Sequence, residues 1–366
     1  MATFSDDRVA RALDRANDFW DARSSRPIVS IYTEPAYRQE SDPARLLAGA
    51  EACIRQDAAS GEPDILPTFW PDFGTISTAA IWGGEIIPPP PGGFIHIHPV
   101  AETVEDLAKL RPRPFEETDF QRAITLFRAL EKQMPDTPLF IRTPDFQGPM
   151  NTLALVMRQT EMLCALYDAP GAIGRALDHI ADVLIDYVGR FLREIGPERV
   201  IGNIWPFITL PANRGVAVTQ DYMPLLGKEA YAEFEVPRLR RIADAFGGVF
   251  IHCCGVYRQH LETLKNGNFK LYGLEMAHPQ MDPQAVYEVF GDDIAYLVGV
   301  SPDGLRDYPT TVEFARHLAT QPCSRARYWF AATPDWLDTA ALHDVVETSF
   351  GRESPHPESI PSRLHP

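Results

Sequence analysis

The pair of residues best suited to chemistry is His252 and Cys254, which stand two positions apart in the segment GGVFIHCCG. Residues 248–252, GVFIH, are predicted to form a β-strand because β-branched and aromatic residues fill them. Side chains two positions apart on an extended chain point the same way, so an imidazole nitrogen and a thiolate sulfur can meet one zinc ion. The spacing therefore indicates a zinc site, although a packed histidine and a small buried cysteine would give the same pattern.

A third ligand is predicted at Glu275, which ends the next predicted strand and follows His252 by 23 residues. That separation is about the length of one helix and one strand, so the carboxylate can return to the same edge of the sheet. Three protein ligands that leave a fourth position open are typical of catalytic zinc. We therefore expect His252, Cys254 and Glu275 to bind the metal.

Two aspartates that follow predicted strands are candidate catalytic groups. Asp72 lies among aromatic residues in the segment FWPDF, and Asp145 follows Arg142 in RTPDF. Either carboxylate can serve as an acid, a base or a substrate anchor, but an aspartate after a strand is also a common helix cap.

Four further polar or aromatic residues are expected to contact the substrate. Three of them, Trp70, Asn203 and Trp205, end predicted strands, and Tyr222 lies in TQDYMP, where it can close the pocket. His96 and His98 form a second spaced pair of histidines, but no acidic ligand lies beside them. We interpret them as surface or lid residues.

These residues depend on strands that end at one face, and the chain contains eight strand-like runs separated by amphipathic, helix-like stretches. The runs are residues 27–33, 65–70, 139–143, 200–204, 248–252, 269–275, 294–299 and 326–331. Eight alternating strands and helices favour a (β/α)8 TIM barrel of α/β class, whose active site lies at the carboxyl ends of the strands. A doubly wound open sheet remains the alternative.

We expect residues 1–366 to form a single barrel domain with two additions. Residues 1–25 are predicted to contain an N-terminal helix, and residues 83–99, GGEIIPPPPGGFIHIHP, to form a Pro/Gly-rich lid or wall over one mouth of the barrel. The N-terminus lacks the apolar core of a signal peptide, and no apolar stretch is long enough to cross a membrane. The sequence therefore predicts a cytoplasmic protein.

Charge and cysteine content limit the partners. The formal net charge of −16 disfavours nucleic acid and anionic membranes and favours a small-molecule substrate or a protein partner, including a second copy in a homodimer. Five cysteines in a reducing compartment are interpreted as free thiols or metal ligands. No P-loop, dinucleotide-binding fingerprint or G-x-S-x-G motif is present.

Four passages spread over nearly the whole chain carry a family resemblance: DILPTFWPDFGT, TPDFQGPMNTLALV, DYMPLLGKEAYAEFEVPRLRRI and FGGVFIHCCG. They resemble the uroporphyrinogen decarboxylase superfamily, which also contains corrinoid-dependent methyltransferases. The last two passages are the most specific. In that family a segment like LLGKEAYAEFEVP precedes the fifth strand, which ends in an H-x-C-G or related pattern.

One activity that the resemblance implies is cofactor-free decarboxylation. The family's decarboxylase uses an aspartate after the second strand and arginines after the first to hold a porphyrinogen with many carboxylates. Asp72 lies near the place of that aspartate. Tyr32, Glu34 and Ala36 stand where basic residues are expected, which disfavours the haem-pathway reaction.

The other implied activity is methyl transfer. The family's methyltransferases bind zinc through an H-x-C pair, matched by His252 and Cys254, and through a cysteine after the last strand. Here Ala331 and Ala332 occupy that region, so Glu275 would take the cysteine's place. The zinc lowers the pKa of a thiol so that the thiolate attacks a methyl group on cobalt.

The prediction is a zinc-dependent methyltransferase that moves a methyl group between a corrinoid and a small thiol or oxygen nucleophile. Because the chain lacks a D-x-H-x-x-G signature, the corrinoid would be carried by a partner protein. The first alternative is a cofactor-free decarboxylase of a small or tetrapyrrole-like carboxylic acid, with Asp72 central. The second is a barrel that binds a ligand without catalysis.

Overall fold

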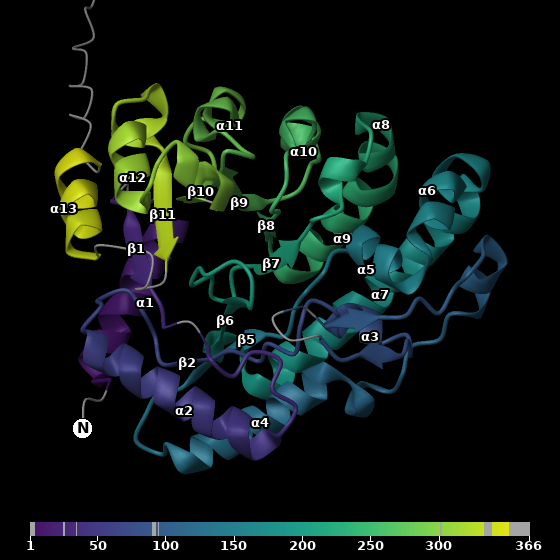
Figure 1. Ribbon diagram of the computed structural model, residues 1–366, viewed down its shortest axis with the longest axis horizontal. Coiled ribbons are helices and arrows are strands. Elements are labelled where there is room, and N and C mark those ends of the chain that lie inside the picture. The colour runs from purple at the N-terminus through teal and green to yellow at the C-terminus, as the bar shows by residue number, and fades with distance from the viewer. Residues whose placement is uncertain are drawn as a thin grey trace, which may run out of the picture.

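The computed structural model describes residues 4–24, 26–33, 35–89, 93, 95–300, 302–332 and 339–350, and Glu34 lies outside this set. Strands and helices alternate along most of the chain, with the helices outside the strands (Figure 1). The strands are β1 (Ile28–Ile31), β2 (Thr68–Phe69), β3 (Ile86–Ile87), β4 (His96–Ile97), β5 (Phe140–Thr143), β6 (Val200–Asn203), β7 (Val216–Thr219), β8 (Val249–His252), β9 (Leu271–His278), β10 (Ala295–Val300) and β11 (Arg327–Ala332).

The helices are mostly short, and the longest, α7, is amphipathic, with charged residues along its outer face. Among the described residues, no helix is both long enough and apolar enough to cross a membrane. The helices are α1 (Asp6–Trp20), α2 (Pro43–Ser60), α3 (Ser77–Ala80), α4 (Asp119–Gln133), α5 (Pro149–Val156), α6 (Gln159–Asp168), α7 (Pro170–Ile195), α8 (Lys228–Ala230), α9 (Val236–Phe246), α10 (Leu261–Lys265), α11 (Pro283–Phe290), α12 (Thr311–Ala319) and α13 (Thr339–Ser349).

The central strands form two parallel sheets, which makes the fold a mixed α/β arrangement similar to a TIM barrel. One sheet has the order β1-β11-β10-β9-β8-β7 and the other the order β2-β5-β6. Among the described residues, backbone pairing joins the strands into these two sheets without closing a full ring, an arrangement compatible with the predicted TIM barrel. The strand β2 has two residues, too few to pair with both neighbours, and β7 meets the chain after β5 through a bridge between Gln147 and Thr219.

The interior of the six-stranded sheet is filled at the end where its strands begin. Phe19 and Trp20, at the end of α1, pack there against Phe250, Tyr272 and other inward residues of the sheet. The rings of Trp20 and Trp329 stack with centroids 5.7 Å apart. This packing leaves the opposite end, where the strands finish, for a functional site.

All eight predicted runs contain a strand, but β7 was not predicted. It has four residues and follows β6 without an intervening helix, so the alternation of strands and helices gave no sign of it. Both strands end near the same site. The unpredicted strand therefore adds a loop to that site.

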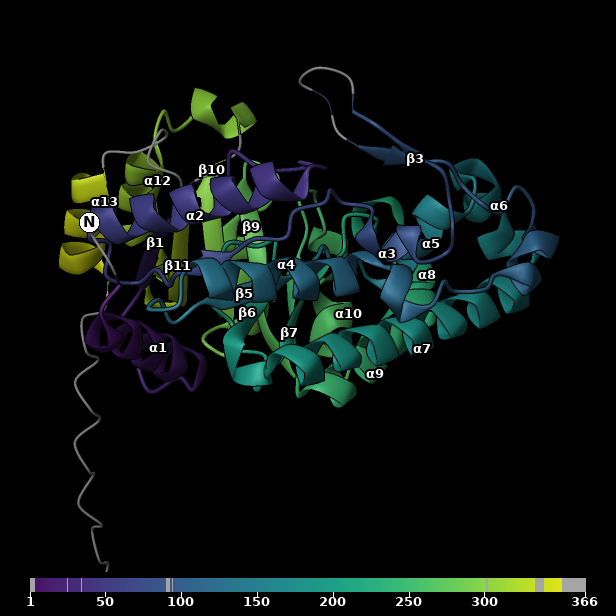
Figure 2. The ribbon, with the colours of Figure 1, turned by 90° about the horizontal axis from the view of Figure 1, so that it is seen from below.

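The Pro/Gly-rich segment 83–99 contains the antiparallel pair β3 and β4, which lies across the molecule from α1 (Figure 2). Residues 90–92 and 94 are outside the described set. The amide of Ile95 donates to Gln39 Oε1 at 3.2 Å, and the Ile95 side chain packs where a Cβ on Gly74 would lie. The base of the segment thus contacts the loops after β1 and β2, and His96 and His98 are both exposed.

Candidate metal centre

The loops after β7 and β8 bring three potential metal ligands together. His252 ends β8, Cys254 follows two residues later, and Asp221 lies two residues beyond the end of β7. One ligand atom from each of the three lies within 4.8 Å of the others. Strand pairing explains the meeting, because β7 and β8 are parallel neighbours with Thr219 opposite His252.

The distances between these groups suit a single ion. His252 Nε2 lies 3.3 Å from Cys254 Sγ and 3.8 Å from Asp221 Oδ1. The amide of Cys254 donates to Asp221 Oδ1 at 2.9 Å, which holds the carboxylate beside the thiol. His252 is buried, whereas Cys254 and Asp221 are exposed, so a substrate can approach from the side of these two ligands.

Glu275 occupies a different place from the one predicted. Its carboxylate contacts His252 Nδ1, the imidazole nitrogen that faces away from Cys254. A carboxylate on one ring nitrogen fixes the tautomer and leaves the other nitrogen as a ligand. The geometry therefore favours Asp221 as the third ligand and gives Glu275 the task of orienting His252.

The charges around His252 favour a cation at this position. Burial alone would lower the pKa of the His252 imidazole, but Glu275, the Cys254 thiol and Asp221 together raise this pKa well above its usual value. The two adjacent thiols also differ. Burial raises the pKa of Cys253 to about 12, so this thiol stays protonated and packs in the core.

Asp145, a predicted catalytic residue, lies fully buried in the loop after β5. Its carboxylate accepts from Gln147 Nε2 and from Thr219 Oγ1, the latter at 3.3 Å. Burial raises the pKa of Asp145 to about 7. The hydrogen bond from Gln147 lowers this pKa, whereas the nearby negative charge of Asp221 raises it further. The group can therefore exchange a proton near neutral pH.

Asn203 and Tyr222, predicted to bind substrate, lie in the walls of the site. Asn203 is fully buried, and its Oδ1 accepts from the amides of Phe146 at 3.0 Å and Ile204 at 2.8 Å. This side chain thus joins the loops after β5 and β6. Tyr222 is partly buried, and its amide donates to Asn151 Oδ1.

Aromatic rings connect the metal ligands to the loop after β2. The Trp205 ring lies 6.1 Å from the His252 ring and 4.4 Å from the Phe207 ring, measured between centroids. The Phe207 ring in turn lies 5.0 Å from the Trp70 ring. Trp205 is partly exposed, but Trp70 is buried, so Trp205 is the better placed of the two to contact a substrate.

Asp72 forms an ion pair with Arg38, a residue that the sequence analysis did not select. Arg38 Nε lies 2.8 Å from Asp72 Oδ2, and the Arg38 guanidinium stands over the Trp205 ring at 5.1 Å. Arg38 follows β1, and the three-dimensional fold alone brings it to Asp72. No spacing in the sequence indicated this pair.

A second arginine, Arg142 at the heart of β5, is fully buried. One of its nitrogens donates to the carbonyls of Asn203, Pro206 and Ile208 at 3.0, 3.2 and 2.7 Å. Its guanidinium lies 4.1 Å from the centroid of the Trp70 ring. Burial lowers the pKa of Arg142 to about 10, so the side chain remains charged at neutral pH and supports the loop that carries Trp205.

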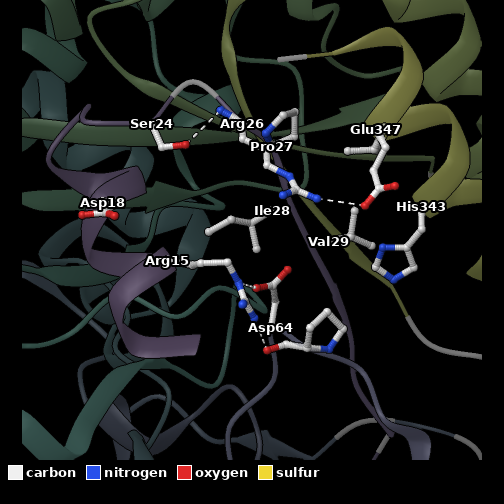
Figure 3. A pocket seen from close by; sticks show the side chains of 12 residues that line it. Arg15, Asp18, Ser24, Arg26, Pro27, Ile28, Val29, Asp64, His343 and Glu347 are labelled. Carbon is white, nitrogen blue, oxygen red and sulfur yellow. Dashed lines mark hydrogen bonds and ion pairs between the residues drawn. The ribbon is translucent and has the colours of Figure 1, made fainter. Parts of the chain in front are cut away.

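A separate recess of about 360 Å³ lies between α1, the start of β1 and α13 (Figure 3). Four of its charged side chains form two ion pairs, Arg15 with Asp64 and Arg26 with Glu347 at 2.8 Å, and Asp18 pairs with Arg23 outside the recess at 2.8 Å. His343 pairs with Glu62 at 2.9 Å. The recess lies at the beginning of the strands, and its paired charges are those of a structural contact.

Asp221 is a candidate ligand that was not predicted from the sequence. Its signal was present, because the acid follows the run VAVT by two residues in the segment VTQDYMP. If VAVT had been recognised as a strand, Asp221 would have been predicted at a strand end, as Asp145 was. It would then have been expected near His252. Ala331 and Ala332 lie in β11, and residues 333–338, which follow them, are outside the described set.

Comparisons with known proteins agree with the fold. No protein-family model matches the chain, and no curated protein matches it significantly. Among solved structures, a methyltransferase from Methanosarcina mazei is similar with a TM-score of 0.64 and 14% identity, over 92% of this chain and 98% of that one. At this identity the likeness shows the fold alone.

A second solved structure is a putative vitamin-B12-independent methionine synthase from Listeria monocytogenes. It has a TM-score of 0.41 and 12% identity, over 88% of this chain and 92% of that one. A TM-score of this size is too low to support an argument.

Proposed function

We propose that this chain is a zinc-dependent methyltransferase of the uroporphyrinogen decarboxylase superfamily, with Asp221, His252 and Cys254 as the metal ligands. The observation that carries the proposal is the convergence of their three ligand atoms at the carboxyl ends of β7 and β8. The overall likeness in fold to a methyltransferase is compatible with this proposal.

The donor set fits zinc. An imidazole nitrogen, a thiolate sulfur and a carboxylate oxygen are all common zinc ligands, and a set of three leaves one position for a substrate. When bound, zinc would supply Lewis-acid activation of a small thiol or oxygen nucleophile at neutral pH. Because Asp221 and Cys254 are exposed, a substrate could reach these two residues from solvent.

The surrounding residues account for the remaining needs of methyl transfer. A methyl group moves without its bonding electrons, so the nucleophile supplies the new electron pair and must lose a proton. Asp145 has a pKa of about 7 and interacts electrostatically with Asp221 and His252. It is the proposed proton acceptor. Trp205 and Tyr222 would bound the substrate. A corrinoid on a partner protein is the proposed methyl carrier.

Elemental analysis tests the metal site. Protein purified without a histidine tag is expected to contain about one zinc ion per chain, and Asp221→Ala, His252→Ala and Cys254→Ala are each expected to lose it. Asp72→Asn is the matched control, because it removes a carboxylate charge from the same mouth without touching these ligands. Metal-free wild-type protein from zinc-rich medium would overturn the proposal.

One observation favours the alternative of cofactor-free decarboxylation. Arg38 follows the first strand and pairs with Asp72 after the second, which supplies a cation and a carboxylate at neighbouring strand ends. If the protein holds no metal, this pair becomes the proposed centre of the reaction. Loss of turnover in Asp72→Asn with full turnover in Cys254→Ala would then support it.

A further inference from the structure

Asp221 differs from the other two proposed ligands in how it is held. Its side chain is 41% exposed, and it lies in a loop beyond the end of β7. The hydrogen bond from the Cys254 amide orients its carboxylate, but the loop decides where that carboxylate lies. The residues on either side of Asp221 therefore determine whether it can meet His252 and Cys254.

Both of these neighbours are anchored by buried groups. On one side, the amide of Gln220 donates to the His252 carbonyl at 2.8 Å, and Gln220 Nε2 donates to Glu235 Oε1 at 2.6 Å. On the other side, the amide of Tyr222 donates to Asn151 Oδ1 at 2.9 Å. Asp221 is thus an exposed residue between two fixed ones.

The hydrogen bond from the Tyr222 amide to Asn151 is the first in a buried series of hydrogen bonds that ends at Asp145. We call this series the hydrogen-bond chain. Asn151 Nδ2 donates to Gln147 Oε1 at 2.5 Å, and Gln147 Nε2 donates to Asp145 Oδ2. Asp145, Gln147 and Asn151 are each at most 4% exposed. Water therefore cannot readily replace a lost partner in this chain.

The groups at the two ends of the hydrogen-bond chain determine which atom donates and which accepts in each of its hydrogen bonds. A backbone amide can only donate, so Asn151 must present its oxygen to Tyr222 and its nitrogen to Gln147. Gln147 must then present its oxygen to Asn151 and its nitrogen to Asp145, where an ionised carboxylate can only accept. Every donor along the chain meets an acceptor, so the orientation of each amide is specified.

Close packing keeps the two loops in register. A Cβ on Gly148, at the start of α5, would lie 1.9 Å from Gln220 Nε2, so only glycine lets the β7 loop approach this closely. The amide of Met150 donates to Glu235 Oε2 at 3.0 Å. The start of α5 and the Asp221 loop are therefore held against each other on both sides of the chain.

We propose that Asp145, Gln147 and Asn151 are positioning residues that hold Asp221 in its metal-binding place. The inference rests on the proposed metal site and adds to it the residues on which its third ligand depends. Outer residues of this kind change metal affinity by about tenfold to a hundredfold when they are lost.

The test is zinc affinity measured by competition with a chromophoric chelator at about pH 8. Asn151→Ala removes the acceptor of the Tyr222 amide and is expected to weaken zinc binding at least tenfold. Asn151→Asp keeps that acceptor but cannot donate to Gln147, and it is expected to weaken binding to a similar extent. The negative charge that it adds would by itself strengthen zinc binding, so the two effects have opposite signs.

A double variant gives the sharpest outcome. Asp145→Asn alone is expected to change affinity less than about threefold, because the new amide can turn its oxygen toward Gln147. Combined with Asn151→Asp, it lets the Gln147 amide rotate, so that the two side-chain hydrogen bonds of Gln147 reverse direction while the Tyr222 amide still donates to residue 151. The double variant is therefore expected to bind zinc within about threefold of wild type.

Thr152→Val is the matched control. Thr152 is buried on the same helix, and its hydroxyl bonds Thr78 Oγ1 at 3.0 Å and the backbone carbonyl of Gln147 at 3.3 Å, so its loss destabilises the start of α5 but leaves the side-chain hydrogen bonds of Asp145, Gln147 and Asn151 in place. If wild type binds zinc and Asn151→Asp binds it as tightly, or the double variant is no better, the metal site stands and this inference is overturned. If wild type binds no zinc, the proposed function fails first.

Discussion

At the scale of single residues, Glu275 and Asp221 lie on opposite sides of the His252 ring, which is why we propose different roles for them. Both are carboxylates near His252, but Glu275 contacts Nδ1 and Asp221 lies on the side of Nε2 and Cys254. An imidazole that binds a metal through one nitrogen is best supported by a carboxylate on the other. In the proposed site, Asp221 would therefore bind the metal together with His252 and Cys254, and Glu275 would orient the His252 ring.

Replacing Glu275 by glutamine tests that role. The amide oxygen of Glu275→Gln can still accept the Nδ1 proton, but without a negative charge, so zinc affinity is expected to fall about tenfold. The measurement is chelator competition on purified apoprotein. An affinity equal to that of wild type would show that Glu275 does not support His252.

At the scale of elements, helix α2 is attached to the end of β1 through a buried carboxylate. Asp57 on α2 is 4% exposed, and its Oδ1 accepts from the Thr33 amide at 2.9 Å. The loop after β1, which carries Arg38, begins at this contact. The packing of α2 therefore helps to set the place of Arg38 beside Asp72.

The pH dependence of stability tests this contact. Burial raises the pKa of Asp57 to about 6 from its ordinary value of 3.8, although the bond from Thr33 and the charge of Arg8 lower it. A raised pKa means that the folded protein binds the proton more tightly. The stabilisation is then complete below about pH 4 and is lost as the pH rises through 6.

Relative to Asp57→Asn, whose amide oxygen can still accept from Thr33, wild type is expected to lose up to about 3 kcal/mol of unfolding free energy between about pH 4 and 6. Urea unfolding of both proteins over this range measures the difference. A difference that does not vary with pH would contradict the assignment.

At the scale of the whole molecule, the large aromatic packing cluster and the proposed metal site lie at opposite ends of the strands. The aromatic residues of α1 fill the beginning of the six-stranded sheet, where Trp20 Nε1 also donates to the Thr209 carbonyl at 2.6 Å. The proposed metal ligands lie where the strands finish. The paired charges in the recess of Figure 3 belong to the first of these ends.

Truncating Trp20 tests whether the packing at one end of the strands affects metal binding at the other. Trp20→Ala is expected to lower the free energy of unfolding by about 3–5 kcal/mol, because it leaves a cavity among large rings, and to leave zinc affinity unchanged. Chemical denaturation and chelator competition measure the two quantities. Arg11→Ala, on the exposed face of α1, should change neither. A large loss of zinc affinity in Trp20→Ala would show that the two ends are coupled.

The sequence by itself determined the strand runs, their alternation with helices and the placement of His252 and Cys254 on one side of a strand. These features depend on periods of two and 3.6 residues, which bonds and backbone angles impose locally. Tertiary structure alone decided that Asp221 lies beside these residues, that Glu275 contacts His252 and that Arg38 pairs with Asp72. Contacts of this kind join loops from different strands, so they depend on strand register and loop packing, and neither leaves a fixed spacing in the chain.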